Sequence, residues 1–263
     1  MIKRIRAALL ALCMALSLAP VSVFAQAATG KCGKNVYYSY DPATYELTIT
    51  GTGDMASYEI SLPAPWKSFR EEIENVSIAD SVTSIGSYAF YECRGLTSIT
   101  IPCGVTRIGE NAFQYCYNLE QITIPDSVTS IGDKAFYLTA YYVERTNREN
   151  GVLYIGNHLI KAFDISGEYE IKSGTKTIAG NAFDWCNGLT AITIPGSVTY
   201  IGDDAFSNCT GLTAVTIPDS VLSIGNQAFT SCTGLTSVTI PKGVTSIGDY
   251  VFQGCYDLAE IKV

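Results

Sequence analysis

The stretch Leu96–Asn118, with the sequence LTSITIPCGVTRIGENAFQYCYN, decides the fold of this 263-residue chain. Edited copies of it begin at Ile73, Leu119, Leu189, Leu212 and Leu235. Successive starts lie 23 residues apart, except for one interruption after Thr139. Self-similarity at a period of roughly 20–50 residues is typical of solenoids, in which each repeat contacts only its neighbours.

Each copy keeps the same apolar positions, and these predict the course of one coil. In the quoted copy they are Leu96, Ile99, Ile101, Val105, Ile108, Phe113 and the small Cys116. The alternation in Ser98–Ile101 predicts a half-buried strand, and Pro102 ends it because proline cannot donate to a sheet. We expect a second corner at Gly109, where the backbone needs a conformation that glycine tolerates best. Asn111–Phe113 is expected to form a single helical or 3₁₀ turn.

One coil cannot fold alone, because its few apolar side chains do not offset the entropy lost on ordering 23 residues. The burial is complete only when neighbouring coils cover both open faces. The sequence therefore predicts a right-handed stack of 23-residue coils, with short parallel β-strands and one short helical or 3₁₀ turn per coil.

Residues 1–25 resemble a cleaved secretory signal. Three basic residues stand near the start, Ala7–Leu18 is apolar, and small residues surround Ala25. A transmembrane anchor is the alternative, but it needs about 20 apolar residues, and Pro20 interrupts the run. We therefore expect export, with no membrane insertion after cleavage, and a secreted or cell-surface location.

The chain is acidic. Its formal charge is −8, and removal of Lys3, Arg4 and Arg6 with the leader changes this to −11. Such a charge offers no basic surface for nucleic acid or for an anionic membrane.

Residues 26–72 lack the repeat, and we interpret them as an N-terminal β cap. Val36–Tyr40 and Tyr45–Ile49 flank the turn residues Asp41–Thr44, a pattern that predicts a β-hairpin. About 40 residues provide little core for an independent domain, so we expect the hairpin to cover the first coil.

The remaining chain divides into repeats at 73–141, an insert at 142–168 and repeats at 169–263. Ile124 and Ile171 lie 47 residues apart, one more than two repeats, so the insert replaces a coil. Within it, Val152–Ile155 and His158–Ile160 flank Gly156–Asn157, which predicts a second hairpin.

These repeats resemble those of the BspA-like leucine-rich-repeat surface proteins of bacteria. The resemblance covers residues 73–263 and rests on units such as ITIPGSVTYIGDDAFSNCTGL, at 192–212. The insert ENGVLYIGNHLIKA, at 149–162, resembles inserts of that family. The resemblance implies a leucine-rich-repeat solenoid that adheres to host matrix proteins or other cells. No wall-sorting signal or membrane anchor is recognisable, which leaves the mode of attachment open.

The sequence contains no recognisable catalytic constellation, and we expect a protein that is not an enzyme and needs no cofactor. His158 is the only histidine and is expected to be a half-exposed structural residue. Serine and threonine recur with the repeat period, so they hold equivalent surface positions rather than nucleophilic ones.

Six cysteines share one repeat position: Cys93, Cys116, Cys186, Cys209, Cys232 and Cys255. Stacked coils place equivalent residues about 4.8 Å apart, but their Cβ atoms point in the same direction, which disfavours disulfides. We predict a buried ladder of free thiols rather than a zinc site, because a line cannot supply a tetrahedron. Cys103 is expected to be exposed, and its pairing with Cys32 is left open.

Aspartates recur after the strand at Asp80, Asp126 and Asp219, and after the glycine corner at Asp133, Asp203 and Asp249. Weak calcium sites are one interpretation. Solvated turn residues held by local hydrogen bonds are the favoured one, so no metal site is predicted.

Aromatic residues gather around the insert, and we predict that they contact a partner: Tyr115, Tyr117, Tyr137, Tyr141, Tyr142 and Trp185. Exposed tyrosine and tryptophan anchor many interfaces. The alternative is that the insert packs over these rings and buries them. Another outward column, Thr100, Thr123, Thr193, Thr216 and Thr239, is expected to form a flat, uncharged face.

Two functions are compatible with these patterns. The favoured one is a secreted or cell-surface recognition and adhesion module for an extracellular or host matrix protein, another cell-surface molecule or a glycan. The alternative is a structural spacer that self-associates end to end through the strand at Leu258–Val263. Ice binding through the threonine column is disfavoured, because the adjacent column mixes Ser98, Gln121 and Ala191.

Overall fold

The computed structural model describes residues 27–263. The leader expected at 1–25 lies outside the described residues. Within the described part, no helix is long and apolar enough to cross a membrane.

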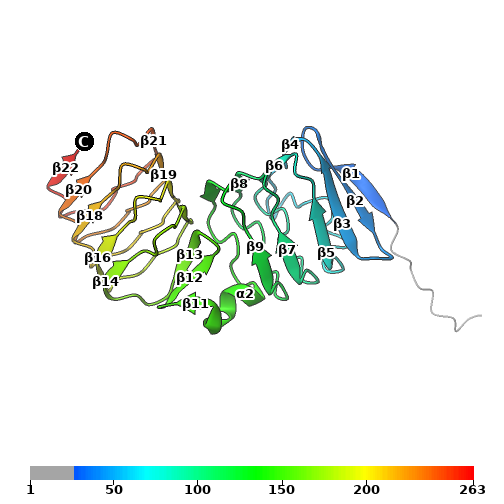
Figure 1. Ribbon diagram of the computed structural model, residues 1–263, viewed down its shortest axis with the longest axis horizontal. Helices are drawn as coiled ribbons and strands as arrows, with labels where there is room; N and C mark the ends of the chain where they lie inside the picture. The colour runs from blue at the N-terminus through cyan, green and yellow to red at the C-terminus, as the bar shows by residue number, and fades with distance from the viewer. Residues whose placement is uncertain (1–26) are drawn as a thin grey trace, which may run out of the picture.

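The chain is a solenoid of about eight coils, and their strands succeed one another along its long axis (Figure 1). The first strand of each coil lies where the sequence predicts it, and pairing is parallel with a shift of 23 residues, as between Ser98 and Gln121. These strands are β5 (Asn75–Ile78), β7 (Ser98–Thr100), β9 (Gln121–Thr123), β14 (Gly167–Glu170), β16 (Leu189–Thr193), β18 (Ala214–Thr216), β20 (Ser237–Thr239) and β22 (Glu260–Lys262). The predicted solenoid is confirmed.

A second parallel strand follows in each coil, which the sequence pattern did not predict. Except in β4, it ends at the isoleucine before the second corner, and most copies are two residues long, too short for alternation to reveal. These strands are β4 (Gly53–Asp54), β6 (Val82–Ile85), β8 (Arg107–Ile108), β10 (Ser130–Ile131), β15 (Thr177–Ile178), β17 (Tyr200–Ile201), β19 (Ser223–Ile224) and β21 (Ser246–Ile247).

The third side of each coil consists of turns, where we expected a helical turn at Asn111–Phe113. Asn111 and Tyr115 have left-handed backbone angles, with φ of 53° and 63°. The N–H groups of Asn111, Phe113 and Tyr115 donate to carbonyl groups of the next coil at 2.9, 2.7 and 3.0 Å. Bonding between coils therefore replaces bonding within a helix.

The core is built from stacked phenylalanines, one per coil. Ring centroids lie 5.1 Å apart for Phe90 and Phe113, and 5.0 Å apart for Phe206 and Phe229. Trp66 stacks on Phe90 at 5.8 Å, and its Nε1 donates to the carbonyl of Ala89 at 2.8 Å. Trp66 therefore closes the N-terminal end of the stack.

Glycine recurs at the second corner because coils approach closely there. The expected reason at Gly109 was an unusual backbone angle, but its φ is not left-handed. A Cβ at Gly109 would instead lie 2.4 Å from the Ser87 nitrogen in the preceding coil. In the first coil after the insert, the preceding segment is the insert and not a regular coil, and Ala179 takes the place of this glycine.

The six repeat cysteines form the expected ladder of free thiols, buried except for the half-buried Cys255. Four of them donate to the phenylalanine carbonyl of the preceding coil, for example Cys116 Sγ to Phe90 at 3.1 Å and Cys232 Sγ to Phe206 at 3.0 Å. Cys32 is buried, Cys103 is exposed, and both are free.

The N-terminal strands form the predicted hairpin and join it to the first coil. They are β1 (Ala28–Lys31), β2 (Val36–Asp41) and β3 (Glu46–Gly51), paired antiparallel. Strand β3 pairs in parallel with β5, Glu46 lying opposite Asn75. The sheet of the cap therefore continues into the repeats (Figure 1).

The insert contains two short helical segments and a hairpin. Its elements are α2 (Ala140–Val143), the 3₁₀ turn η1 (Arg145–Asn147), β11 (Arg148–Glu149), β12 (Val152–Ile155) and β13 (His158–Ala162). Thr139 holds the position of the ladder cysteines, and its hydroxyl accepts from the N–H of Tyr142 at 3.1 Å, so it caps α2.

The insert hairpin has two apolar faces. Leu153, Ile155 and Ile160 join the core of the preceding coils. Val152, Tyr154 and Leu159 join the core of the following ones. The continuous apolar runs in both strands follow from this burial on both faces.

His158 is fully buried, which corrects the expectation of a half-exposed side chain. Its Nε2 donates to the carbonyl of Pro125 at 3.2 Å, and its Nδ1 lies 2.9 Å from the hydroxyl of Thr177. The ring therefore links β13 to the coils on both sides. Burial lowers its pKa.

Candidate functional site

Five tyrosine rings from three consecutive coils and one from the insert form a continuous row along the turn side, here called the tyrosine strip: Tyr88, Tyr91, Tyr115, Tyr117, Tyr137 and Tyr142. Ring centroids lie 5.4 Å apart for Tyr88 and Tyr91, 5.5 Å for Tyr91 and Tyr115, and 6.3 Å for Tyr115 and Tyr137. Tyr117 contacts Tyr115 at 5.8 Å, and Tyr142 contacts Tyr137 at 5.3 Å.

The fold does not require aromatic residues on these turns. Tyr115 has a left-handed φ of 63°, and Asn208 and Ser231 hold the same position with φ of 59° and 57°. Asparagine adopts this conformation more readily than tyrosine does. The rings are therefore a property of the first coils and not of the repeat.

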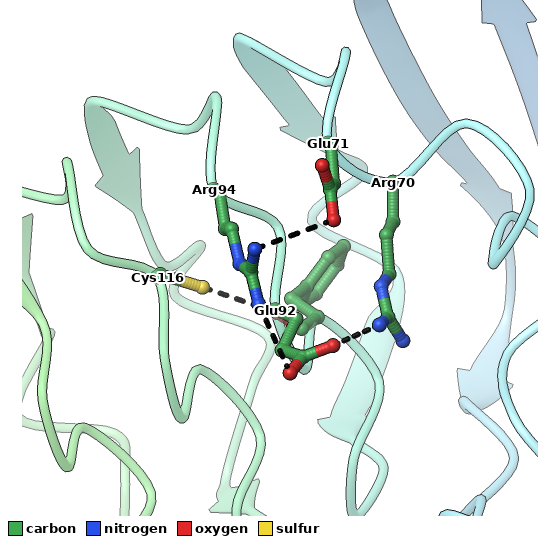
Figure 2. A network of polar contacts seen from close by, with 6 residues as sticks. Arg70, Glu71, Glu92, Arg94 and Cys116 are labelled. Atoms are coloured by element: carbon green, nitrogen blue, oxygen red, sulfur yellow. Dashed lines mark hydrogen bonds and ion pairs between the residues drawn. The ribbon is translucent and has the colours of Figure 1, made fainter.

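Two arginines lie against the strip at its N-terminal end, and Figure 2 shows the acidic residues that hold them. The Arg94 guanidinium lies 5.5 Å from the Tyr117 ring centroid. Its Nη1 is 3.5 Å from Glu71 and its Nη2 is 3.3 Å from Glu92, which also pairs with Arg70. Such partly exposed pairs contribute little stability, but they fix the cation over the ring.

The strip runs between two pockets. The first has a volume of about 160 Å³ and is lined by Trp66, Arg70, Tyr88 and Tyr91 among others. Beside it, Ile60 is 66% exposed. The second, of about 100 Å³, adjoins Tyr137 and Tyr142 where the insert replaces a coil.

The six residues predicted from the sequence do not form one cluster. Tyr115, Tyr117, Tyr137 and Tyr142 belong to the strip; Tyr117 is exposed and the other three are half-buried. Trp185 is 66% exposed and has no ring contact with the strip within residues 27–263. Of all six, Tyr117 and Trp185 are the most accessible.

Tyr141 and Tyr142 pack against the insert. The Tyr141 hydroxyl donates to the carbonyl of Tyr154 at 3.1 Å, and both rings contact the core before the insert. Burial raises the pKa of each hydroxyl. These two rings therefore support the insert as well as bordering the surface.

Sequence reasoning missed Tyr88, Tyr91 and Arg94. Tyr88 and Tyr91 are three residues apart in one coil and stand where other coils have asparagine or glutamine, as at Asn111 and Gln114. The replacement of these polar residues by tyrosine is visible in the sequence and could have added both residues to the predicted site. The position of Arg94 over Tyr117 depends on how adjacent coils align, which the pattern within one coil does not reveal.

The threonine column is exposed along the first strands of the coils, as expected. Repeated aspartates take part in local hydrogen bonds, such as Asp126 with the Asn157 side chain at 2.8 Å and Asp203 with the Asn226 N–H at 2.6 Å. Within residues 27–263, no group of three or more metal-ligating side chains lies together. Stacking and hydrogen bonding are therefore the chemistry that the strip offers.

Comparison with known proteins gives one family match. Residues 67–187 and 154–263 match the BspA type Leucine rich repeat region, with six copies. A search of curated proteins finds no match.

Solved structures of similar fold include three bacterial proteins. A leucine-rich repeat protein from Eubacterium ventriosum is 25% identical over 91% of this chain and 85% of that one, with a TM-score of 0.40. A leucine rich cell surface protein from Faecalibacterium prausnitzii is 20% identical over 90% and 94%, with a TM-score of 0.37. A leucine rich repeat protein from T. pallidum is 27% identical over 86% and 78%, with a TM-score of 0.31.

Proposed function

The chain belongs to the BspA-type leucine-rich-repeat family, and we propose that it is a secreted or cell-surface recognition module whose tyrosine strip binds an extracellular partner. Solenoids of this kind present extended surfaces built from many coils. The expected leader and the family match support a location outside the cell. The observation that carries the proposal is the row of tyrosines on turns where the fold accepts small polar residues.

The strip has the chemistry of a contact surface. Tyrosine and arginine are enriched among the residues that contribute most to binding. Tyrosine also loses little conformational entropy on binding, because it has few rotatable bonds. Arg94 is already held by Glu71 and Glu92, so a partner does not have to order it.

Two double variants test this proposal. Tyr88→Ala with Tyr117→Ala removes two strip rings, whereas Tyr250→Ala with Tyr256→Ala removes rings from the same repeat positions in a later coil. Tyr250 and Tyr256 are 67% and 86% exposed, so the control removes at least as much accessible aromatic surface. Both variants and the unmodified protein are applied to arrays of glycans and of extracellular matrix proteins.

We expect the unmodified protein to bind a partner on these arrays. The strip variant should then bind at least about 30-fold more weakly, equivalent to about 2 kcal/mol, while the control variant binds within about twofold of the unmodified protein. Equal losses in both variants would contradict a role for the strip. Self-association without any array binding would favour the structural spacer instead.

A further inference from the structure

The pocket beside the insert continues the tyrosine strip into the interior. It lies between the turn at 134–137 and the turn at 179–184, and its volume is about 100 Å³. Phe136, Ile160 and Ala179 provide an apolar wall, and all three are buried. Tyr137 and Tyr142 also line it, so the pocket adjoins the end of the strip.

Backbone donors on one wall of this pocket have lost their acceptors. In the preceding coil, the N–H groups of Asn111 and Phe113 donate to the next coil at 2.9 and 2.7 Å. The equivalent N–H groups of Lys134 and Phe136 have no hydrogen-bond partner within residues 27–263. The reason is that the insert stands where the next coil would present its carbonyl groups. An N–H group left without an acceptor is costly when buried.

On the opposite wall, the carbonyl groups of Asn181, Ala182 and Asp184 are occupied, whereas that of Gly180 has no donor within residues 27–263. Lys161 Nζ donates to the carbonyl of Asn181 at 2.7 Å and to that of Asp184 at 3.4 Å. The N–H of Ala162 donates to the carbonyl of Ala182 at 2.7 Å. Strand β13 thus donates hydrogen bonds to carbonyl groups of the following coil, but it offers no acceptors to the N–H groups of Lys134 and Phe136 in the preceding coil. The unsatisfied backbone groups of the pocket therefore include two donors, the N–H groups of Lys134 and Phe136, and one acceptor, the carbonyl of Gly180.

Charges around the pocket nearly balance. Lys134 pairs with Asp133 at 3.0 Å, and Lys161 lies near Asp184. Burial lowers the pKa of Lys161 and raises that of Asp184, so both shifts favour the uncharged forms. Lys134 is already paired with Asp133, and Lys161 already donates to two carbonyl groups. An uncharged acceptor therefore fits the pocket better than a carboxylate or a phosphate does.

We propose that this pocket binds the acetamido group of an N-acetylated sugar whose ring lies against Tyr137. The methyl group packs on the apolar wall, and the acetamido oxygen accepts from the N–H group of Phe136. An apolar cavity of about 150 Å³ accommodates benzene, so a volume of about 100 Å³ suits a smaller group. The inference rests on the proposed function, because it assigns a ligand class to one end of the same strip.

The test compares two trisaccharides on the exported chain. Triacetylchitotriose carries acetamido groups, and cellotriose has the same β-1,4 linkage without them. Titration calorimetry should give at least tenfold tighter binding of triacetylchitotriose. In ¹⁵N spectra, the amide resonances of Lys134 and Phe136 should shift with triacetylchitotriose and not with cellotriose. This readout needs no substitution.

Substitutions then locate the site. Ala179→Leu fills the pocket, and Tyr137→Ala removes the ring; each should weaken triacetylchitotriose binding at least tenfold. Thr230→Ala, at the repeat position of Tyr137 in a regular coil, should leave it unchanged. Equal binding of both sugars, no binding of either, or shifts confined to residues around Tyr88 would overturn the acetamido assignment. Array binding by the Tyr88 and Tyr117 double variant is measured independently of these sugars. Failure of the acetamido assignment can therefore be distinguished from failure of the proposed function of the strip.

Discussion

At the scale of single residues, the repeat positions accept only what fits between stacked coils. Gly109 leaves no room for a Cβ against the Ser87 nitrogen. Cys116 is small enough to be buried, and its thiol satisfies the carbonyl of Phe90 in the preceding coil. Both residue types are thus explained by contacts to a neighbouring coil and not by the conformation of their own coil.

Gly109→Ala tests the close approach. The added methyl group meets backbone atoms that cannot move aside, so we expect a loss of about 1–3 kcal/mol, the usual range for overpacking. Gly196→Ala is the matched control, because a Cβ there meets nothing within 4 Å and its φ is ordinary. That variant should be neutral or more stable by up to about 1 kcal/mol. Urea unfolding midpoints measure both; a Gly109→Ala variant as stable as Gly196→Ala would contradict the packing argument.

Buried His158 should make stability depend on pH. Burial lowers its pKa below the ordinary 6.5 in the folded state, although the nearby Asp126 carboxylate opposes this. The unfolded chain therefore binds a proton more readily, so stability is retained above pH 6.5 and lost as pH falls from 6.5 to the folded pKa. His158→Gln cannot take up this proton. We expect its urea midpoint to fall less between pH 7 and pH 5 than that of the unmodified protein, and parallel curves would disprove the role of His158.

At the scale of elements, the insert hairpin joins two cores that otherwise do not merge. Ile160 packs into the core before it and the adjacent Leu159 into the core after it. Each strand of the hairpin therefore contributes side chains to both hydrophobic cores. The hairpin replaces a coil by covering both open faces.

Neighbouring substitutions in β13 should destabilise opposite halves. Ile160→Ala should lower amide-exchange protection mainly in residues 73–139, and Leu159→Ala mainly in residues 177–255. Each should cost about 2–5 kcal/mol, the usual range for large-to-small core changes. Hydrogen exchange followed by mass spectrometry resolves the two regions. The same pattern of loss in both variants would mean that the cores act as one.

Elements with a sequence period were predictable, and those that depend on contacts between coils were not. Strand β7 follows from alternation in Ser98–Ile101. Strand β8 has only two residues, and the turn at Asn111–Phe113 resembles a helical turn because both bring residues three apart close together. Similarly, the glycine at 109 could be located but not explained.

The candidate site was predictable in part for the same reason. Tyr115 and Tyr117 stood out because equivalent residues in regular coils are small or polar. Trp185 was grouped with them by distance along the chain, yet the insert separates its coil from the strip. The unsatisfied N–H groups of Lys134 and Phe136 depend on how the insert packs, so no residue pattern could reveal them.

At the scale of the whole molecule, the two halves should unfold together because the hairpin is buried in both. The sequence has two tryptophans, so Trp185→Phe leaves Trp66, buried at the N-terminal end of the stack, as the only one. Its fluorescence reports on that end, whereas circular dichroism reports on all coils. We expect coincident urea midpoints in this variant and separated ones when Ile160→Ala is added. Separated midpoints without Ile160→Ala would contradict coupling through the hairpin.

The ladder of hydrogen bonds between coils also has a mechanical consequence. These bonds run along the long axis, from one coil to the next. Tension between the two ends therefore loads every interface between coils with the same force, and a terminal coil, which a neighbour covers on one face only, should open first. Each 23-residue coil that opens adds roughly 80 Å of extended chain. A molecule held between a surface and a bound partner would lengthen stepwise under flow. Each opening coil would dissipate mechanical energy while the coils that remain folded stay bound to the partner.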